Sequence, residues 1–126
     1  MSRQPANNLK HQQTYLFKPK KVEKMLKVMS LLKRKEGMSF EEFKTWILVD
    51  HRKFADEIPG LRKYTVNILA NQNDDLPADA VNELYFDDEA ARVAGFASDA
   101  GKAAGGDAAA HTSSRTHLLM IENKQF

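Results

Sequence analysis

One histidine stands where it could transfer protons. His51 follows Phe43 by eight residues and Ile47 by four, a spacing that puts all three on one face of a helix. The neighbours on that face are apolar, so the imidazole would point into the protein and not into water. Imidazole is the side chain that titrates closest to neutral pH, which suits it to general acid or base catalysis. A core histidine bonded to a backbone carbonyl would show the same spacing.

Two tyrosines, an arginine and the single tryptophan are the next candidates. Tyr64 and Tyr85 fall on separate expected strands, where either hydroxyl could orient a carbonyl group or share a proton. Arg62 alternates onto the strand face of Tyr64 and could bind a carboxylate, while Trp46 could wall a pocket for a flat ligand. Plain packing, or solvation for the arginine, is also an ordinary role for each. The predicted catalytic residues are His51, Tyr64 and Tyr85, and the predicted substrate-binding residues are Trp46, Arg62, Phe43 and Phe54.

Other catalytic and metal-binding chemistries lack the residues that they need. The chain contains no cysteine, which excludes thiol nucleophiles, disulfides and cysteine-ligated zinc. His11, His111 and His117 are scattered without the spacing of metal ligands, so no metal site is predicted. Asp50 adjoins His51, but neighbouring helical residues diverge by about 100° and are weak candidates for a dyad. No glycine-rich phosphate loop or nucleophile elbow is present, and no cofactor is expected.

Length and composition are typical of one small globular domain. Hydrophobic residues make up 42% and charged residues 29% of the 126 residues, and the formal net charge is +2. So small a charge does not favour nucleic-acid binding, and no stretch approaches the ~18 apolar residues of a membrane span. Neither nucleic acid nor a membrane is therefore an expected partner. The lack of cysteine agrees with a cytoplasmic location.

The first 23 residues differ from the rest of the chain. They are rich in Gln, Asn and Lys and carry no steady periodicity, which predicts a flexible basic arm. The lysines near Tyr15 and Phe17 could touch phosphate or an anionic surface, but short basic runs are usually solvent-exposed. Residues 24–126 are predicted to form the folded domain.

Hydrophobic periodicity and chain breakers predict the order strand, helix, strand, strand, helical region, strand. Ser39 and Glu42 form a capping box that starts a helix, and Pro59-Gly60 ends it. A second helical piece is expected from Ser98, with Gly105-Gly106 weakening or ending it. The expected strands are 25–34, 61–70, 81–86 and 117–123, and the main expected helices are 40–58 and 89–97.

This order is the split βαβ arrangement of an α+β, ferredoxin-like βαββαβ fold with a four-stranded antiparallel sheet. The helices of such a fold cover one face of the sheet and leave the other face bare. A large apolar sheet face is normally covered in a folded protein. We therefore expect a homodimer in which the sheets of two copies pack against each other.

The segment from Leu31 to Tyr64 resembles the signature region of the EthD family. That family has a strand ending in Lys-Arg, a Gly-Met-Ser helix start, a phenylalanine eight residues before a histidine, and Pro-Gly-Leu-Arg-x-Tyr at the next strand. Residues 83–87 and 98–101 are similar to its third strand and second helical piece. The matching residues of the first block are Lys33, Arg34, Gly37, Met38, Ser39, Phe43, His51, Pro59, Gly60, Leu61, Arg62 and Tyr64.

Two positions depart from the family pattern. Ile47 stands where an aromatic residue is common, and Lys53 stands where a proline often follows the histidine. Without that proline, the helix is expected to run smoothly past His51. The pocket wall near these residues is therefore expected to differ from that of other members.

The resemblance implies a dimeric α/β barrel and a cofactor-free enzyme of catabolism or secondary metabolism, similar to methylmuconolactone methylisomerase. Such an enzyme would act by proton transfer, in isomerisation, cyclisation or dehydration of a small lactone, aromatic or carbonyl metabolite. The expected ligand is hydrophobic or bears a carboxylate. The alternative is a non-catalytic binding or accessory protein of an ether- or aromatic-degradation pathway, which would use the same pocket.

Overall fold

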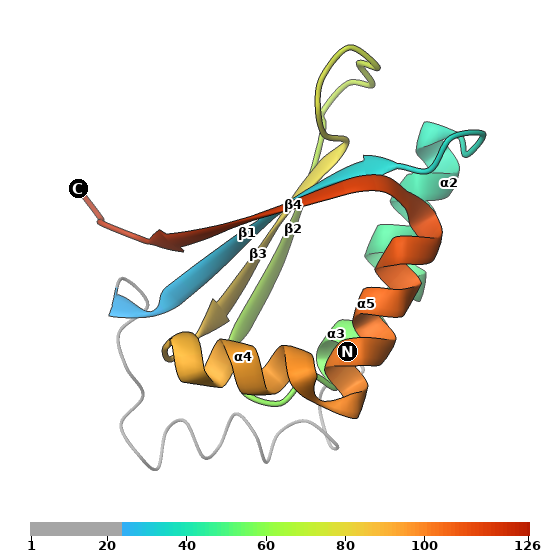
Figure 1. The fold of residues 1–126 in the computed structure, drawn as a ribbon. Helices are drawn as coiled ribbons and strands as arrows, with labels where there is room; N and C mark the ends of the chain where they lie inside the picture. The colour runs from blue at the N-terminus through green and yellow to red at the C-terminus, as the bar shows by residue number, and fades with distance from the viewer. Residues whose placement is uncertain (1–23) are drawn as a thin grey trace.

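The computed structural model describes residues 24–126, so the predicted arm of residues 1–23 lies outside the described residues (Figure 1). Strands and helices follow one another in the order expected from the sequence. The strands are β1 (Leu26–Arg34), β2 (Lys63–Ile68), β3 (Ala80–Phe86) and β4 (Thr112–Ile121). The helical segments are α2 (Phe40–Thr45), η2 (Trp46–Asp50), α3 (Arg52–Asp56), α4 (Glu89–Ala97) and α5 (Asp99–His111).

The four strands form one antiparallel sheet in the order β2-β3-β1-β4. The helices all lie on one side of this sheet, with α5 running beside α2 and α3, and α4 beneath the strands (Figure 1). The arrangement confirms the predicted α+β, ferredoxin-like fold. It also creates two layers, the sheet and the helices, and the space between them is either packed with side chains or left as a cavity.

Apolar side chains from both layers form the core. Phe43 and Ile47 are fully buried, as their place on the apolar face of the helix predicts, whereas Phe54 is only half-buried. Burying each large side chain contributes about 1.5–3 kcal/mol, so this apolar face anchors the first helical segment to the sheet. On the strands, alternate residues face the helices, namely Val28 and Leu32 of β1 and Leu84 and Phe86 of β3.

The first helical segment begins with the predicted capping box. The Ser39 hydroxyl accepts from the Glu42 backbone N–H at 3.0 Å, and the Glu42 carboxylate accepts from the Ser39 N–H at 2.8 Å. Two backbone donors that the helix start would leave unpaired are thereby satisfied. This local pattern was readable from the sequence because both partners lie within one turn.

The expected smooth helix past His51 is wrong. The π-helical turn η2 interrupts it, and the His51 N–H donates to the Trp46 carbonyl at 2.8 Å, five residues back. A π turn holds more residues than an α turn, so the side chains rotate relative to the expected register. Trp46 and Ile47 are both buried as a result, and His51 still faces the sheet.

Helix α5 is longer than the sequence suggested. Gly105-Gly106 does not end it, and it continues to His111. The helix starts with a Ser98 cap that accepts from the Gly101 N–H at 3.0 Å, and it is held to the body by buried Ala104 and Ala108. Packing thus outweighs the roughly 1 kcal/mol that each glycine costs in a helix. As a consequence β4 begins at Thr112, five residues earlier than expected.

Close packing at two glycines fixes α4 against its neighbours. A Cβ on Gly95 would lie 2.7 Å from the Pro59 carbonyl oxygen, and one on Gly101 would overlap the Gly95 carbonyl oxygen. Both approaches involve backbone atoms and leave no room for a side chain. The second half of α4 therefore packs closely against the turn at Pro59 that follows α3, and the start of α5 packs closely against α4.

The arginine of the Lys33-Arg34 pair anchors a loop. Asp79 is fully buried, and its carboxylate accepts from both the Arg34 backbone N–H and the Arg34 guanidinium at 2.8 Å each. A buried carboxylate is stable only when its charge is paired and hydrogen-bonded in this way. The pair fixes the loop before β3 to the end of β1, so its role is structural.

The face of the sheet turned away from the helices is partly apolar. Met29 and Leu31 of β1 lie on it half-buried, and Leu118 and Met120 of β4 are 42% and 45% exposed. None of the helices within residues 24–126 covers this face (Figure 1). It is the surface from which a sheet-to-sheet homodimer was expected.

Candidate active site

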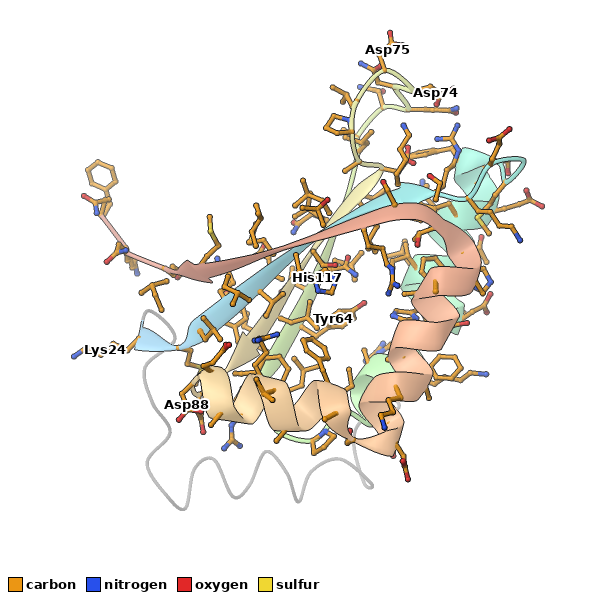
Figure 2. The ribbon with its side chains drawn as sticks, viewed as in Figure 1. Lys24, Tyr64, Asp74, Asp75, Asp88 and His117 are labelled. Carbon is orange, nitrogen blue, oxygen red and sulfur yellow. The ribbon has the colours of Figure 1, made fainter. Side chains whose placement is uncertain are left out.

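A cavity of about 390 Å³ lies between the helix-facing side of the sheet and helices α3, α4 and α5. This volume falls in the range of sites for small molecules. Figure 2 shows Tyr64 and His117 on the helix side of the sheet, in the space that the helices enclose. The polar lining residues are Ser30, His51, Tyr64, Asn82, Lys102, Arg115 and His117; most of the others are aliphatic, with Phe96 from α4.

His51 lines this cavity and is held by a carboxylate. The side chain is 7% exposed, and its Nδ1 lies 2.7 Å from Oδ2 of Asp107 on α5. An ionised carboxylate can only accept, so Nδ1 carries the hydrogen and donates. The neutral ring then keeps its lone pair on Nε2, which makes His51 a base of defined orientation. The partner is thus a carboxylate, in place of the backbone carbonyl considered as an alternative.

Asp107 is itself held by the Trp46 indole, which in turn stacks on His111. The indole N–H of Trp46 donates to the same Oδ2 at 3.0 Å, and the Trp46 ring stacks on His111 with centroids 4.6 Å apart. The Trp46 ring also lies 4.9 Å from the His51 ring. The π turn places Trp46 here, so the indole positions the carboxylate that positions the imidazole.

Tyr64 and Asn82 form a second polar pair on the sheet wall. The Asn82 amide donates to the Tyr64 oxygen at 3.2 Å, which leaves the phenol O–H available to donate to a ligand. Burial raises the pKa of Tyr64, so this hydroxyl keeps its proton at neutral pH. The Asn82 carbonyl oxygen is buried and has no hydrogen-bond partner among residues 24–126. A buried acceptor of this kind calls for a donor, and a ligand in the cavity can supply one.

A polar row crosses the sheet at the level of Asn82. In the strand registers, Asn82 pairs with Ser30, and Ser30 pairs with His117. All three residues line the cavity. Burial, with the positive charges of Arg115 and Arg92, lowers the pKa of His117, so this imidazole is neutral at neutral pH. The row therefore offers uncharged donors and acceptors to a ligand.

Two cations stand at the mouth of the cavity. Lys102 of α5 and Arg115 of β4 both line it and are both exposed. One guanidinium N–H of Arg115 donates to the Gly105 carbonyl of α5 at 3.3 Å, which ties the side chain to the helix. The mouth is thus positively charged.

The structure brings two of the predicted site residues, His51 and Tyr64, to the cavity. The other five do not line it: Tyr85, Trp46, Arg62, Phe43 and Phe54. Tyr85 lies on the opposite sheet face, where its hydroxyl oxygen is 2.9 Å from a carboxylate oxygen of Glu122 and 3.2 Å from one of Glu83. Arg62 pairs with Asp87 at 3.0 Å. The function proposed below therefore does not use these five residues to contact the ligand.

Sequence reasoning missed Asp107, Asn82 and the mouth cations. Asp107 lies in an alanine- and glycine-rich helix that gives little sign of chemistry, although it stands four residues before His111. Asn82 is a polar residue in an apolar strand, where asparagine is disfavoured, and this mismatch could have marked it as a candidate site residue. His117 was noted only as a scattered histidine. The sheet register brings Asn82 and His117 to the cavity, and the packing of α5 brings Asp107 to His51; the sequence alone provides neither.

Among residues 24–126, no three histidine, aspartate or glutamate side chains converge as a set that could hold a metal ion. Over the same range, no helix has both the length and the apolar character needed to cross a bilayer.

The fold and the enclosed cavity define a small α+β protein with a ligand-sized site between its two layers. The model of the EthD domain matches residues 35–114, so the chain belongs to the EthD family. This membership confirms the resemblance seen in the signature region. No curated protein matches the sequence significantly.

Three solved structures illustrate the fold. An EthD family protein from Bacillus halodurans is 25% identical, with a TM-score of 0.67 over 79% of this chain and 99% of its own. Hydroxynitrile lyase from Passiflora edulis is 14% identical, with a TM-score of 0.65 over 82% of this chain and 98% of its own. A dimeric ferredoxin-like protein from Thermobifida fusca is 14% identical, with a TM-score of 0.64 over 77% and 90%.

Proposed function

We propose that this protein is an enzyme that needs no cofactor and that moves a proton on a small carbonyl-containing metabolite, such as a ketone or lactone. The observation that carries the proposal is the His51–Asp107 pair at the cavity wall, with Nδ1 held at 2.7 Å and Nε2 left as the basic nitrogen. A merely structural histidine would not need a ligand-sized space beside it. Hydroxynitrile lyase activity on the same fold is consistent with enzyme chemistry in such a cavity.

The proton-transfer step uses groups on opposite walls. Nε2 of His51 takes a proton from the carbon next to the carbonyl group. The C–H electron pair becomes the C=C bond of an enolate, and the carbonyl π pair moves to oxygen. The Tyr64 hydroxyl, kept protonated because burial raises its pKa, donates a hydrogen bond to that oxygen. Where the substrate has a further C=C bond in conjugation with the enolate, protonated His51 then returns the proton to the far carbon of the dienolate, which gives isomerisation. Where the carbon next to the α-carbon bears a hydroxyl group, His51 protonates that oxygen as its C–O bond breaks and water leaves, which gives dehydration.

Apolar walls support this chemistry. Val28, Leu84 and Phe96 line the cavity together with the polar groups. A hydrogen bond or a charge is stronger in such surroundings than in water. Asp107 can therefore stabilise the imidazolium that forms during the step, and Tyr64 can stabilise the enolate.

Solvent exchange tests the proposal without knowledge of the natural substrate. A panel of one- and two-ring ketones and lactones is incubated with the protein in D₂O, and loss of the α-proton signal is followed by NMR. We expect at least one compound to exchange faster with protein than in buffer of the same pH. Compounds that bind but never exchange above the buffer rate would contradict the enzyme assignment and support a carrier or accessory protein.

We further propose that the protein works as a homodimer formed through the bare sheet face. The half-buried Met29 and Leu31 and the exposed Leu118 and Met120 support this, as does the description of the Thermobifida fusca protein as dimeric. Sedimentation at micromolar concentration should give twice the chain mass. Leu118→Glu should shift that mass to the monomer, whereas Val93→Glu, an exposed change on α4, should not. A monomer in the unsubstituted protein would contradict the proposal.

A further inference from the structure

The charges around the cavity are all of one kind. Among residues 24–126, no aspartate or glutamate lines it, whereas the cations Lys102 and Arg115 do. Asp107 stands behind His51, outside the lining, and its carboxylate is already engaged by His51 and Trp46. A ligand that enters this space therefore meets positive charge at the mouth and no fixed negative charge on the walls.

Neither mouth cation has an acidic partner. Within residues 24–126, no ion pair involves Lys102 or Arg115, in contrast to Arg34, Arg62 and Arg92, which pair with carboxylates at 2.7–3.0 Å. The single hydrogen bond of Arg115, to the Gly105 carbonyl, leaves most of its guanidinium donors free. Lys102 lies three residues before Gly105, so it occupies the same face of α5, about one turn away. The two cations thus stand together on one side of the mouth.

A buried acceptor stands at the other side of the cavity. Asn82 is 4% exposed, and its carbonyl oxygen has no hydrogen-bond partner in the described residues although its amide donates to Tyr64. Asn82 is on β3 and Arg115 is on β4, with β1 between them. Since neighbouring strands are about 4.8 Å apart, the two strands are separated by roughly 10 Å. Arg115 also lies two residues along β4 from His117, the residue level with Asn82, so a molecule that reaches both side chains is elongated, on the order of two fused rings.

We propose that the substrate is an organic acid of about two-ring size that carries a hydroxyl group at the end opposite its carboxylate. Arg115 and Lys102 bind the carboxylate, and the buried Asn82 oxygen accepts from the hydroxyl. The apolar strand and helix residues contact the rings between these two ends. The inference rests on the proposed function of the same cavity, but it concerns recognition, and it can stand if the catalytic step is wrong.

Four related compounds separate the two ends of the ligand. 6-Hydroxy-2-naphthoate carries both groups, 2-naphthoate lacks the hydroxyl, 6-hydroxy-2-naphthamide lacks the charge, and 2-naphthamide lacks both. Their dissociation constants are measured by calorimetry with the full chain. We expect the hydroxy acid to bind tightest, with a loss of about 10-fold or more when either group is removed. Equal affinity for acids and amides, or no binding of either acid at millimolar concentration, would overturn the inference.

Variants assign each preference to its residue. Arg115→Gln should reduce the preference for acid over amide by about 10-fold, whereas Lys35→Gln, an exposed change outside the cavity, should leave it intact. Asn82→Leu should remove the preference for the hydroxyl group while the preference for the acid remains. Should Asn82→Leu fail to fold, the 2-naphthoate comparison in the unsubstituted protein still decides the point. A preference that survives both substitutions would contradict the assignment.

Two further readouts separate recognition from catalysis. His51→Gln should bind the hydroxy acid within a few-fold of the unsubstituted protein, since His51 holds neither end of the ligand. Because Arg115 helps to lower the pKa of His117, a bound carboxylate should raise that pKa, which NMR titration of the His117 ring detects. Acid binding without any solvent exchange would defeat the proposed enzyme and leave this inference standing. Solvent exchange on neutral ketones without any binding of the acids would support the proposed enzyme and defeat this inference.

Discussion

Oδ2 of Asp107 lies 2.7 Å from Nδ1 of His51, although the two residues are 56 positions apart. The same oxygen accepts the indole N–H of Trp46 at 3.0 Å. The carboxylate therefore determines which nitrogen of His51 carries the hydrogen and how the ring is turned. It acts as a positioning group because it lies outside the cavity lining while the imidazole lies on it.

Asp107→Asn should disable the site while the fold is kept. An asparagine amide can donate to Nδ1, which would move the ring hydrogen to Nε2 and remove the basic lone pair from the cavity. We expect turnover on any exchanging compound to fall by about 10²-fold or more, with ligand affinity nearly unchanged. Nitrogen-15 NMR of the His51 ring should report the change of tautomer. An unaltered tautomer together with unaltered turnover would show that Asp107 is structural only.

Gly105→Leu should close the mouth of the cavity. Gly105 lines the cavity, and a Cβ there would meet no atom within 4 Å, so the new side chain has room to enter. Leucine also suits a helix better than glycine, so stability should hold or rise by about 1 kcal/mol. We expect kcat/KM to fall by about 10-fold or more.

Gly106→Leu is the matched control for this change. Its Cβ also meets nothing within 4 Å, but Gly106 is exposed and does not line the cavity. This variant should keep the kcat/KM of the unsubstituted protein. If both substitutions had the same effect, the reaction would not take place in this cavity.

Acid should destabilise the fold through a charged network on the bare sheet face. Lys27 pairs with Glu122 at 2.7 Å and with Glu83 at 3.1 Å. A hydrogen bond from Asn67, and then the charge of Lys27, lower the pKa of Glu83; hydrogen bonds from Lys27 and Tyr85 lower that of Glu122. Both pKa values therefore lie below the ordinary 4.5. The stabilisation is present above about pH 4.5 and is lost as the pH falls through the folded values.

Melting curves between pH 6 and pH 3 measure this loss. Glu83→Gln should lower the melting temperature at pH 6 and make its fall toward pH 3 shallower, because one of the coupled carboxylates is gone. Glu36→Gln, which removes an exposed carboxylate that forms no ion pair in the described residues, should keep the full dependence. An identical fall in all three proteins would exclude the network as its source.

The element order, and with it the ferredoxin-like fold, could be predicted from the sequence, but features that depend on how the elements pack could not. The capping box of Ser39 and Glu42 needs only residues within one turn, and its contacts are present as expected. Helix α4 also has its expected bounds, with Asp88 as its cap. The persistence of α5 through Gly105-Gly106 depends instead on how Ala104 and Ala108 pack, which local propensity does not include.

The candidate site shows the same division. Helical spacing placed His51 toward the sheet, and Tyr64 was predicted on a strand as a catalytic candidate; both line the cavity. Tyr85 was predicted with them, but its strand parity puts it on the opposite face from Asn82. Asp107 could not be found because it meets His51 only after α5 packs beside α3. The π turn brings Trp46 to the same carboxylate, and the helix propensities of the individual residues do not indicate such a turn.

Solvent deuterium exchange with His51→Gln tests the central claim most directly. Glutamine roughly keeps the size and hydrogen bonding of the imidazole but cannot titrate. His111→Gln is the matched control, since His111 stacks on Trp46 and lies 3.5 Å from Asp107 but does not line the cavity. We expect exchange to fall by about 10²-fold or more in His51→Gln, with ligand affinity kept, and by a few-fold at most in His111→Gln. Full exchange activity in folded His51→Gln would contradict it.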